Sequence, residues 1–319
     1  MLVATGDDGS HCVMHVYSHG LVTIDIQYDL TSDDAKKRLS YIAFSKNKGI
    51  ESEIQTLLGK KCLYTRSVPS AIKRGKICPY FQLGDDRLWE IHQTTQLVTE
   101  VNSPWQNIKI YKTPDCGNML CLDDEIMIAE SDNIYTLTLL GINRNVYKDK
   151  TILILGGGDG GLLHELLKML PQYVLMVEID KEVINACRKH LRGVCGDTLD
   201  NLDGHNYKIR IENCVNVLKE LAEENQKFDY VINDLSEYLL DTEKGHDNDF
   251  TTTAIILERS MKVLNVGGKY LSRGDSESNV PSIESFGRDV TENGLNFKTF
   301  KIDVPSFKEK YCLFEVWRA

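Results

Sequence analysis

The chain has 319 residues, 42% of them hydrophobic and 26% charged, and a formal net charge of −10. These values are ordinary for a globular protein, and the length allows two domains or one large domain with an extension. The negative charge argues against general nucleic-acid binding and suits a cationic ligand, although solubility alone explains it equally well. No stretch approaches the ~18 apolar residues of a membrane span, and the N-terminus lacks the features of a signal peptide. We therefore expect a cytoplasmic protein that binds neither nucleic acid nor membranes.

The nine cysteines are an odd number and contain no C-x-x-C pair. Cys116 and Cys121 have the closest ligand-like spacing, but no histidine accompanies them. His15 and His19 lie on either side of a hairpin signal, and no third ligand is near them in the sequence. We expect reduced structural thiols and no metal site.

The first two predicted domains precede residue 141. Residues 1–68 predict a small α+β domain, with a hairpin around His19-Gly20 and a helix over 33–58 whose N-cap is Thr31 or Ser32. Residues 69–140 predict a β-strand domain that leads into a helix bearing Tyr135, with Ser131 or Asp132 as its cap. The short strands of this second domain are expected at 87–92, 96–101, 107–111, 119–122 and 125–128.

Residues 141–319 predict a Rossmann-like domain, because strand and helix patterns alternate from Thr151 onward. This alternation is typical of a mostly parallel sheet with helices on both faces. The fold class is therefore α/β, preceded by the β-rich and α+β domains. Strands are expected at 151–155, 174–177, 207–211, 228–232, 269–272 (after a Gly267-Gly268 turn), 298–304 and 311–316. Helices are expected at 162–170, 181–191, 214–224, 251–263 and 283–293.

A glycine-rich turn at 156–161 reads Gly-Gly-Gly-Asp-Gly-Gly and follows the apolar run at 151–155. Its spacing satisfies the G-x-G-x-x-G dinucleotide fingerprint, so an NAD-type enzyme has to be considered. However, the turn carries the acid Asp159, which would repel a pyrophosphate and attract a cationic group. The sequence therefore favours a nucleoside ligand with a positive tail.

Acidic residues follow other predicted strands. Glu178 ends the second strand, about 20 residues beyond the glycines, where an acid typically accepts both ribose hydroxyl protons. Asp234 ends the strand at 228–232 and should face the same crevice, with a turn-forming aspartate as the alternative. On sequence grounds alone, Glu309 is better explained as an exposed loop charge, and Tyr135 reads equally as a core residue.

These motifs resemble those of the polyamine aminopropyltransferases. That family has Gly-Gly-Gly-Asp-Gly-Gly after a buried strand and Val-Glu-Ile-Asp on the next, which stand here at 156–161 and 177–180. The likeness covers nearly the whole chain, and it is longest to the family's spermine-forming branch. The N-terminal unit resembles a shortened form of the family's decarboxylase-like dimerisation domain, which implies a homodimer. Further shared segments are 19–22, 103–110, 129–132, 195–197 and 230–235.

The resemblance implies a class I methyltransferase-like fold and a donor substrate, decarboxylated S-adenosylmethionine, with no tightly bound cofactor. Asp159 would pair with the donor ammonium and disfavour ordinary S-adenosylmethionine, which carries a carboxylate there. Glu178 would hold the ribose, and Gln106 would contact the nucleoside. The remaining residues implied at the donor are Gly156, Gly158, Asn213 and Cys214.

On the acceptor side, the resemblance implies that Asp234 is the base that takes a proton from the attacking amine. Tyr135 would line the acceptor channel, and Glu309 would bind a further ammonium group. Two positions depart from the family pattern. Asn213 replaces an aspartate, although its amide oxygen can still accept from the adenine amine, and Phe307 replaces a tyrosine, which removes one hydroxyl. The segment at 236–238 also differs.

Three functions stay open at this point. The first is transfer of an aminopropyl group to spermidine, which yields spermine and methylthioadenosine. The second is transfer to another acceptor, such as putrescine. The third is a weakly active paralogue that serves as a dimeric binding or regulatory module. A methyltransferase is disfavoured, because Asp159 is poorly placed for a donor carboxylate.

Overall fold

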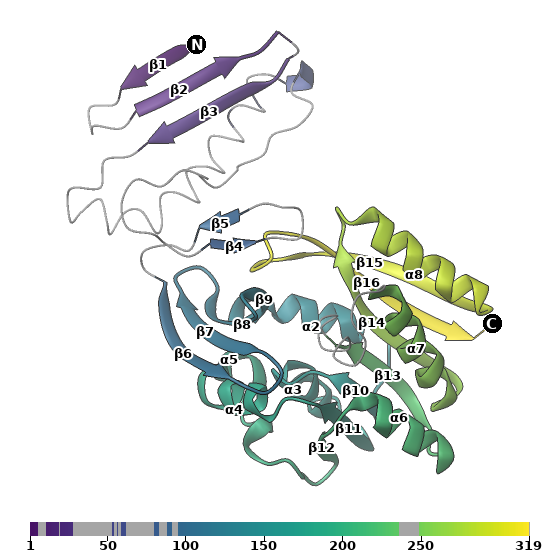
Figure 1. Ribbon diagram of the computed structural model, residues 1–319. Coiled ribbons are helices and arrows are strands. Elements are labelled where there is room, and N and C mark those ends of the chain that lie inside the picture. The colour runs from purple at the N-terminus through teal and green to yellow at the C-terminus, as the bar shows by residue number, and fades with distance from the viewer. Residues whose placement is uncertain are drawn as a thin grey trace. The chain divides into compact units, whose positions relative to one another are not determined.

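Three antiparallel strands form the N-terminal sheet: β1 (Leu2–Thr5), β2 (His11–Val16) and β3 (Val22–Gln27) (Figure 1). The β2–β3 connection closes through the Tyr17 amide, which donates to the Leu21 carbonyl at 2.8 Å. Gly20 has a φ of 94°, which glycine adopts without steric cost. The predicted hairpin is therefore confirmed.

The computed structural model describes residues 1–5, 11–18, 20–27, 53, 56, 59–61, 80–82, 88–90, 95–235 and 249–318. His19, the loop at 236–248 and the predicted helix at 33–58, apart from residues 53 and 56, lie outside these residues. The chain divides into two compact units, residues 1–69 and 70–319. The boundary predicted at 140/141 falls inside the second unit. The first unit also contains a short 3-10 helix, η1 (Gly59–Lys61).

The first strands that the structure describes in the second unit are short and antiparallel. β4 (Tyr80–Gln82) pairs with β5 (Leu88–Glu90), and four further strands form a consecutive antiparallel sheet. Asp123 and Asp124 both have positive φ, 49° and 67°, in the two-residue turn between the last two strands. The four strands are β6 (Gln96–Asn102), β7 (Asn107–Thr113), β8 (Gly117–Leu122) and β9 (Glu125–Ala129).

Asp132, one of the two residues predicted as the cap, is the N-cap residue of the next helix, but its side chain makes no cap hydrogen bond. η2 (Glu130–Asp132) leads into this helix, α2 (Asn133–Leu140). The buried Asp132 carboxylate instead accepts from the Ala129 amide at 2.7 Å and from the Ser306 amide and hydroxyl at 3.0 and 2.5 Å. Tertiary contacts therefore satisfy this carboxylate in place of the helix N-terminus.

The central sheet has seven strands in the order β12-β11-β10-β13-β14-β16-β15. The first five are parallel, and β16 and β15 add to the edge in antiparallel pairing. The predicted mostly parallel sheet is confirmed. Its strands are β10 (Thr151–Gly156), β11 (Tyr173–Glu178), β12 (Tyr207–Ile211), β13 (Phe228–Asp234), β14 (Leu264–Ser276), β15 (Leu295–Val304) and β16 (Glu309–Arg318).

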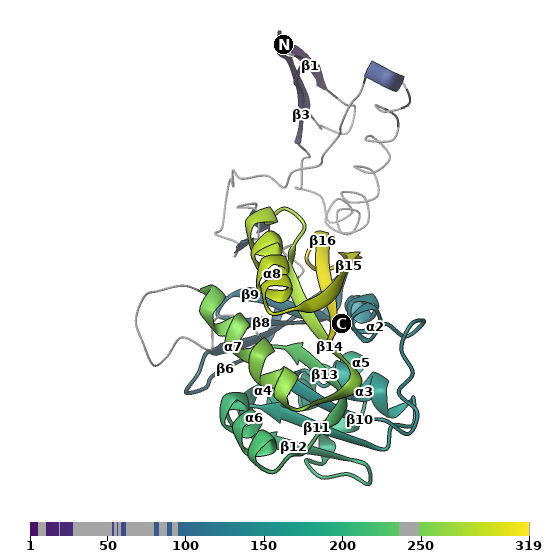
Figure 2. The ribbon, with the colours of Figure 1, turned by 90° about the vertical axis from the view of Figure 1, so that its right-hand side faces the viewer.

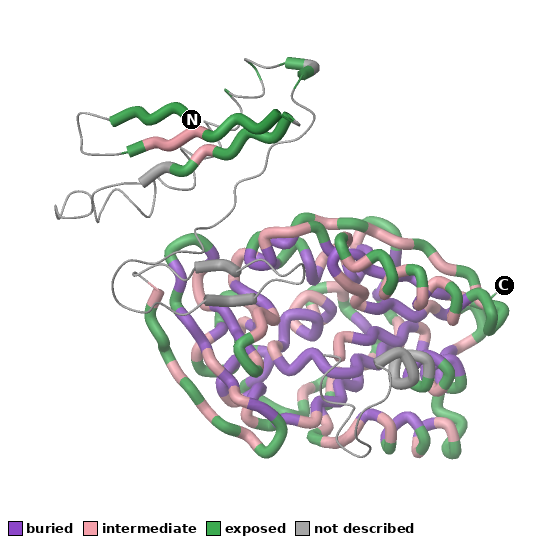
Figure 3. Tube along the Cα trace, turned by 45° about the horizontal axis from the view of Figure 1, so that its top comes forward, coloured by how far each residue is buried: buried purple, intermediate pink, exposed green. Residues whose placement is uncertain are grey.

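Helices cover both faces of this sheet (Figure 2). Ile152 and Ile154 of β10 share one core with α2, α3 and α4, whereas Leu153 and Leu155 share another with α6, α7 and α8. Figure 3 shows buried residues, drawn in purple, in the interior of the second unit. In the described part, no helix is both long and apolar enough to cross a membrane. The helices that follow α2 are α3 (Gly161–Leu167), α4 (Lys181–His190), α5 (Arg192–Cys195), η3 (Thr198–Asp200), α6 (Cys214–Glu223), α7 (Asp249–Lys262) and α8 (Val280–Glu292).

Strand β14 begins earlier than predicted. Its pairing with β13 starts at Leu264 and shifts register before Lys269, and Val266 between them is 97% exposed. The Gly267-Gly268 turn expected before the strand therefore lies within a bulge of the strand itself.

Candidate active site

The glycine turn between β10 and α3 lets the backbone approach the neighbouring strand ends. Gly156 and Gly160 both have a φ of 80°, which disfavours other residues. A Cβ on Gly156 would lie 2.7 Å from the Asp234 carbonyl oxygen, and one on Gly158 would lie 2.7 Å from Glu178 Oε2. The turn therefore lies against the Glu178 carboxylate at the end of β11 and against the Asp234 backbone at the end of β13.

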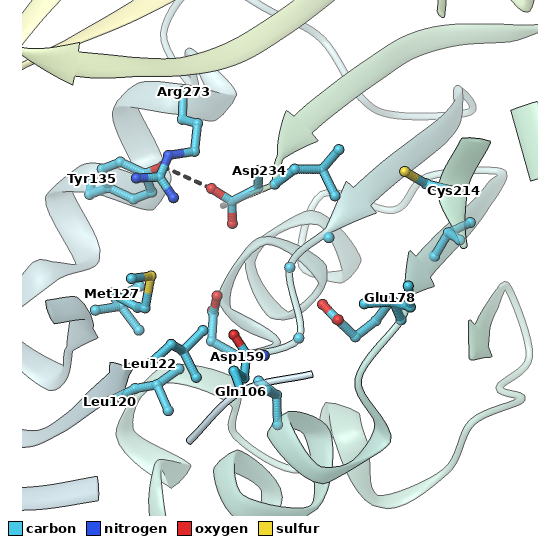
Figure 4. A pocket seen from close by; sticks show the side chains of 18 of the residues that line it. Gln106, Leu120, Leu122, Met127, Tyr135, Asp159, Glu178, Cys214, Asp234 and Arg273 are labelled. Carbon is cyan, nitrogen blue, oxygen red and sulfur yellow. Dashed lines mark hydrogen bonds between the residues drawn. The ribbon is translucent and has the colours of Figure 1, made fainter. Parts of the chain in front are cut away.

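A cavity lies at the carboxyl ends of β10, β11 and β13 (Figure 4). It is lined by every predicted site residue except Glu309. Sequence reasoning missed two of its charged members, Glu212 and Arg273. The lining residues predicted from the sequence are Gln106, Tyr135, Gly156, Gly158, Asp159, Glu178, Asn213, Cys214, Asp234 and Phe307.

Glu178 is 8% exposed at the end of β11, and its Oε1 accepts from the Asp180 amide at 2.9 Å. Burial raises the pKa of this carboxyl to about 7. In the described residues, no ion pair neutralises it. A ligand with vicinal hydroxyls would supply donors to a carboxylate in this position.

Gln106 is oriented by a residue behind the cavity. Its Nε2 donates to Asp180 Oδ2 at 2.9 Å, and the Ser103 hydroxyl donates to the same oxygen at 2.6 Å. Asp180 is 1% exposed and caps α4 by accepting from the Glu182 amide. This arrangement leaves the amide oxygen of Gln106 as the atom that can accept from a ligand.

Asn213 and Cys214 form the start of α6. Asn213 is the N-cap, and its Oδ1 accepts from the Val215 amide at 2.9 Å. The oxygen expected to accept from an adenine amine is therefore already shared with the helix. Burial raises the pKa of the Cys214 thiol to about 12, which keeps it a neutral wall of the cavity.

The opposite side of the cavity is organised around Asp234. The Tyr135 hydroxyl donates to Asp234 Oδ1 at 2.8 Å, and the dashed line in Figure 4 marks this bond. Burial, together with the charge of Asp159, raises the pKa of Asp234 to about 7, while Arg273 and Tyr135 lower it. Burial likewise raises the pKa of Asp159, whose Oδ1 accepts from the Gly161 amide at 2.7 Å. Two like charges at one cavity favour a ligand that brings a cation.

Phe307 lines the cavity beside Tyr135, with ring centroids 6.3 Å apart, and contacts Tyr311 edge-on at 5.3 Å. The bonds from Ser306 to Asp132 fix the segment that carries it. Glu309 points elsewhere, since its Oε2 accepts from the Ser276 hydroxyl at 2.8 Å. The structure thus brings Phe307 to the cavity but not Glu309.

Arg273 reaches the cavity from β14, which is remote in sequence from the glycine turn. No pattern in the sequence distinguishes this arginine from a solvated strand residue, so only tertiary packing reveals it.

Within the described ranges, no group of three or more His, Cys, Asp or Glu residues could hold a metal ion.

The profile of the spermine/spermidine synthase domain matches residues 132–319, which is more than half of the chain. The chain belongs to the spermine/spermidine synthase family. The profile of the spermidine synthase tetramerisation domain matches residues 94–130, which include the four-stranded sheet β6–β9. The family resemblance predicted from the glycine turn and the Val-Glu-Ile-Asp strand is confirmed.

Several proteins similar to this family member are named polyamine aminopropyltransferase. The Pyrococcus abyssi protein is 29% identical over 182 residues, 56% of this chain and 62% of the relative. The Lachnoclostridium phytofermentans protein is 37% identical over 109 residues, 33% of this chain and 38% of the relative. The matched regions therefore span less than two thirds of these relatives.

Solved spermidine synthases share the fold. One, in complex with the transition state analogue AdoDATO, superimposes with a TM-score of 0.61 at 20% identity and covers 78% of this chain and 83% of its own. The enzyme from Thermotoga maritima superimposes with a TM-score of 0.60 at 18% identity, over 80% of this chain and 85% of its own. The predicted Rossmann-like fold class is confirmed.

Proposed function

We propose that this protein is a spermine synthase, which transfers an aminopropyl group from decarboxylated S-adenosylmethionine to spermidine. The observation that carries the proposal is the gathering of Asp159, Glu178 and Asp234 at one cavity at the sheet edge. Two of these carboxylates suit cationic groups, and the third suits a ribose. Family membership supports an aminopropyltransferase, and the spermidine synthase solved with AdoDATO has the same fold.

The donor would lie as a substrate across the glycine turn. Glu178 would accept from the ribose hydroxyls, and the Gln106 amide oxygen would accept from the nucleoside. Asp159 would pair with the ammonium of the aminopropyl group. Because the carboxylate of ordinary S-adenosylmethionine would lie near Asp159, like-charge repulsion would exclude that molecule.

The chemical step would be a direct displacement. An acceptor ammonium has a solution pKa near ~10, so it has to lose a proton before it can attack. The Asp234 carboxylate would take that proton, held in place by Tyr135. The amine lone pair would then form a bond to the carbon next to the sulfonium, and the carbon–sulfur bond would break with its electrons on sulfur. Methylthioadenosine is the leaving group.

Spermidine as the acceptor rests on the long sequence likeness to spermine-forming enzymes. Transfer to putrescine is the alternative within the same chemistry. The placement of Glu309 outside the cavity, and the absence of a hydroxyl on Phe307, also leave a weakly active binding or regulatory module as a second candidate.

A homodimer, with residues 1–68 as its dimerisation domain, is part of the proposal. The match to a tetramerisation domain at 94–130 supports assembly into an oligomer. The seven cysteines in the described part are all free thiols, which supports a reducing, cytoplasmic location.

The proposed reaction predicts release of methylthioadenosine when the protein is incubated with decarboxylated S-adenosylmethionine and spermidine. We expect kcat/KM for spermidine to exceed that for putrescine by about tenfold or more, because a pocket with charged groups discriminates acceptor length and charge spacing. Preference for putrescine would overturn the acceptor assignment. Binding of both substrates without any release would instead favour the regulatory module.

The pH dependence of turnover should follow the Asp234 carboxyl. Its carboxylate is the reactive form, and its pKa lies at about 7 instead of the ordinary 3.8. The base is therefore present above this pKa and lost as the pH falls through it, so kcat/KM, which reports the free enzyme, should drop about tenfold per unit well below pH 7. Initial rates at subsaturating substrates from about pH 5.5 to 8.5 would measure this limb. A kcat/KM that stays level across this range contradicts the prediction.

A further inference from the structure

Arg273 is the one cationic side chain among the described residues that line the cavity. The other charged members of the lining are Asp159, Glu178, Glu212 and Asp234. Figure 4 places the guanidinium beside Tyr135 and Asp234, on the side away from Glu178. A fixed positive charge therefore stands where a cationic acceptor is expected to bind.

The guanidinium is held by an aromatic residue and not by an acid. Arg273 Nη2 donates to the Tyr311 hydroxyl at 3.0 Å, and that hydroxyl donates in turn to the Gly274 carbonyl at 2.6 Å. The guanidinium carbon lies 5.9 Å from the centroid of the Tyr311 ring. Arg273 Nε is buried and has no hydrogen-bond partner.

Arg273 makes no ion pair with a carboxylate in the described part of the chain, and the Tyr135 hydroxyl donates to Asp234 Oδ1 at 2.8 Å. The positive charge of Arg273 nevertheless acts on Asp234, because it lowers the pKa of that carboxyl. An ammonium group near Asp234 would be repelled by the same charge. This repulsion falls as the distance between the two cations grows.

We propose that Arg273 is a specificity-determining residue at the acceptor end of the cavity, which disfavours amines whose second ammonium lies close to the attacking nitrogen. The inference rests on the proposed aminopropyl transfer. It adds that the acceptor is selected by the distance between its two positive charges. An attacking nitrogen at Asp234 is attracted by the acid, whereas a neighbouring ammonium is repelled by the guanidinium. Acceptors with more methylenes between the two nitrogens carry the second charge farther away.

The test compares 1,3-diaminopropane with 1,5-diaminopentane by calorimetric binding in the presence of methylthioadenosine, and by methylthioadenosine release from the donor. The wild-type protein should favour the longer diamine by about tenfold or more, because like charges held close together at a binding site disfavour a ligand. Arg273→Gln should bind both diamines more tightly, the shorter one most, and so reduce the ratio toward one. Arg273→Lys, which keeps the charge, should retain the ratio. Arg288→Gln removes the same charge from an exposed position on α8 and should change nothing.

The proposal is overturned if Arg273→Gln keeps the wild-type ratio, or if Arg273→Lys and Arg273→Gln behave alike. Binding separates this inference from the proposed function. If no variant releases methylthioadenosine with any amine, the proposed transfer fails, while the binding ratio still decides the role of Arg273. A melting curve for each variant shows that a changed ratio does not come from unfolding.

Discussion

Asp234→Asn should lower kcat by about 10²- to 10⁴-fold, the usual contribution of a positioned general base. The amide has the size of the carboxylate, and its oxygen can still accept from the Tyr135 hydroxyl, which donates at 2.8 Å in the wild-type protein. What is lost is the ability to take the proton of the acceptor ammonium. Single-turnover measurement of methylthioadenosine release would report this loss directly.

Binding of the donor should be nearly unchanged in Asp234→Asn, since the proposed role of this residue is at the acceptor. Asp303→Asn makes the same chemical change at an exposed position of β15 and provides the matched control. The variant should also lose the limb of the pH profile near 7, because the titrating carboxyl is gone. Full turnover in Asp234→Asn would rule out this residue as the base.

Asp159→Asn should weaken binding of decarboxylated S-adenosylmethionine by about 10²-fold, the lower part of the range for losing one partner of a buried charge pair. The amide oxygen can still accept from the Gly161 amide, so the glycine turn should keep its shape. The donor ammonium loses its counter-charge. Calorimetry with the donor, and competition by ordinary S-adenosylmethionine, would measure both effects.

The discrimination between the two nucleosides is the sharper readout for Asp159. Removing its charge should raise the affinity for the carboxylate-bearing S-adenosylmethionine and lower the affinity for the decarboxylated donor. The ratio of the two affinities should therefore move toward one. The pKa of Asp234 should also fall, because the charge of Asp159 is one cause of its increase. Asp197→Asn, at an exposed position after α5, is the control. An unchanged ratio would show that Asp159 does not face the donor ammonium.

The sheet and its glycine turn could be predicted because they depend on local patterns. The apolar run at 151–155, the glycines after it and the strand before Glu178 specify one βαβ unit within 30 residues. Since the carboxyl ends of parallel strands meet at one edge, the positions of Asp159, Glu178 and Asp234 followed from the strand ends alone. The bonding partner of the Asp132 side chain and the start of β14 could not be predicted in this way, because a remote serine and a bulge decide them.

By itself, the sequence determined the fold class and the residues that we propose bind the donor, since each of them lies next to a strand or turn that its own neighbours specify. The tertiary structure decided the side of the cavity that we propose binds the acceptor. It placed Tyr135 against Asp234, 99 positions away in the chain, and turned Glu309 toward Ser276. It also brought Arg273 from β14 into the acidic cavity. Such contacts depend on how separate elements pack. The presence of the Arg273 charge in the cavity could therefore not be predicted from the sequence near residue 273.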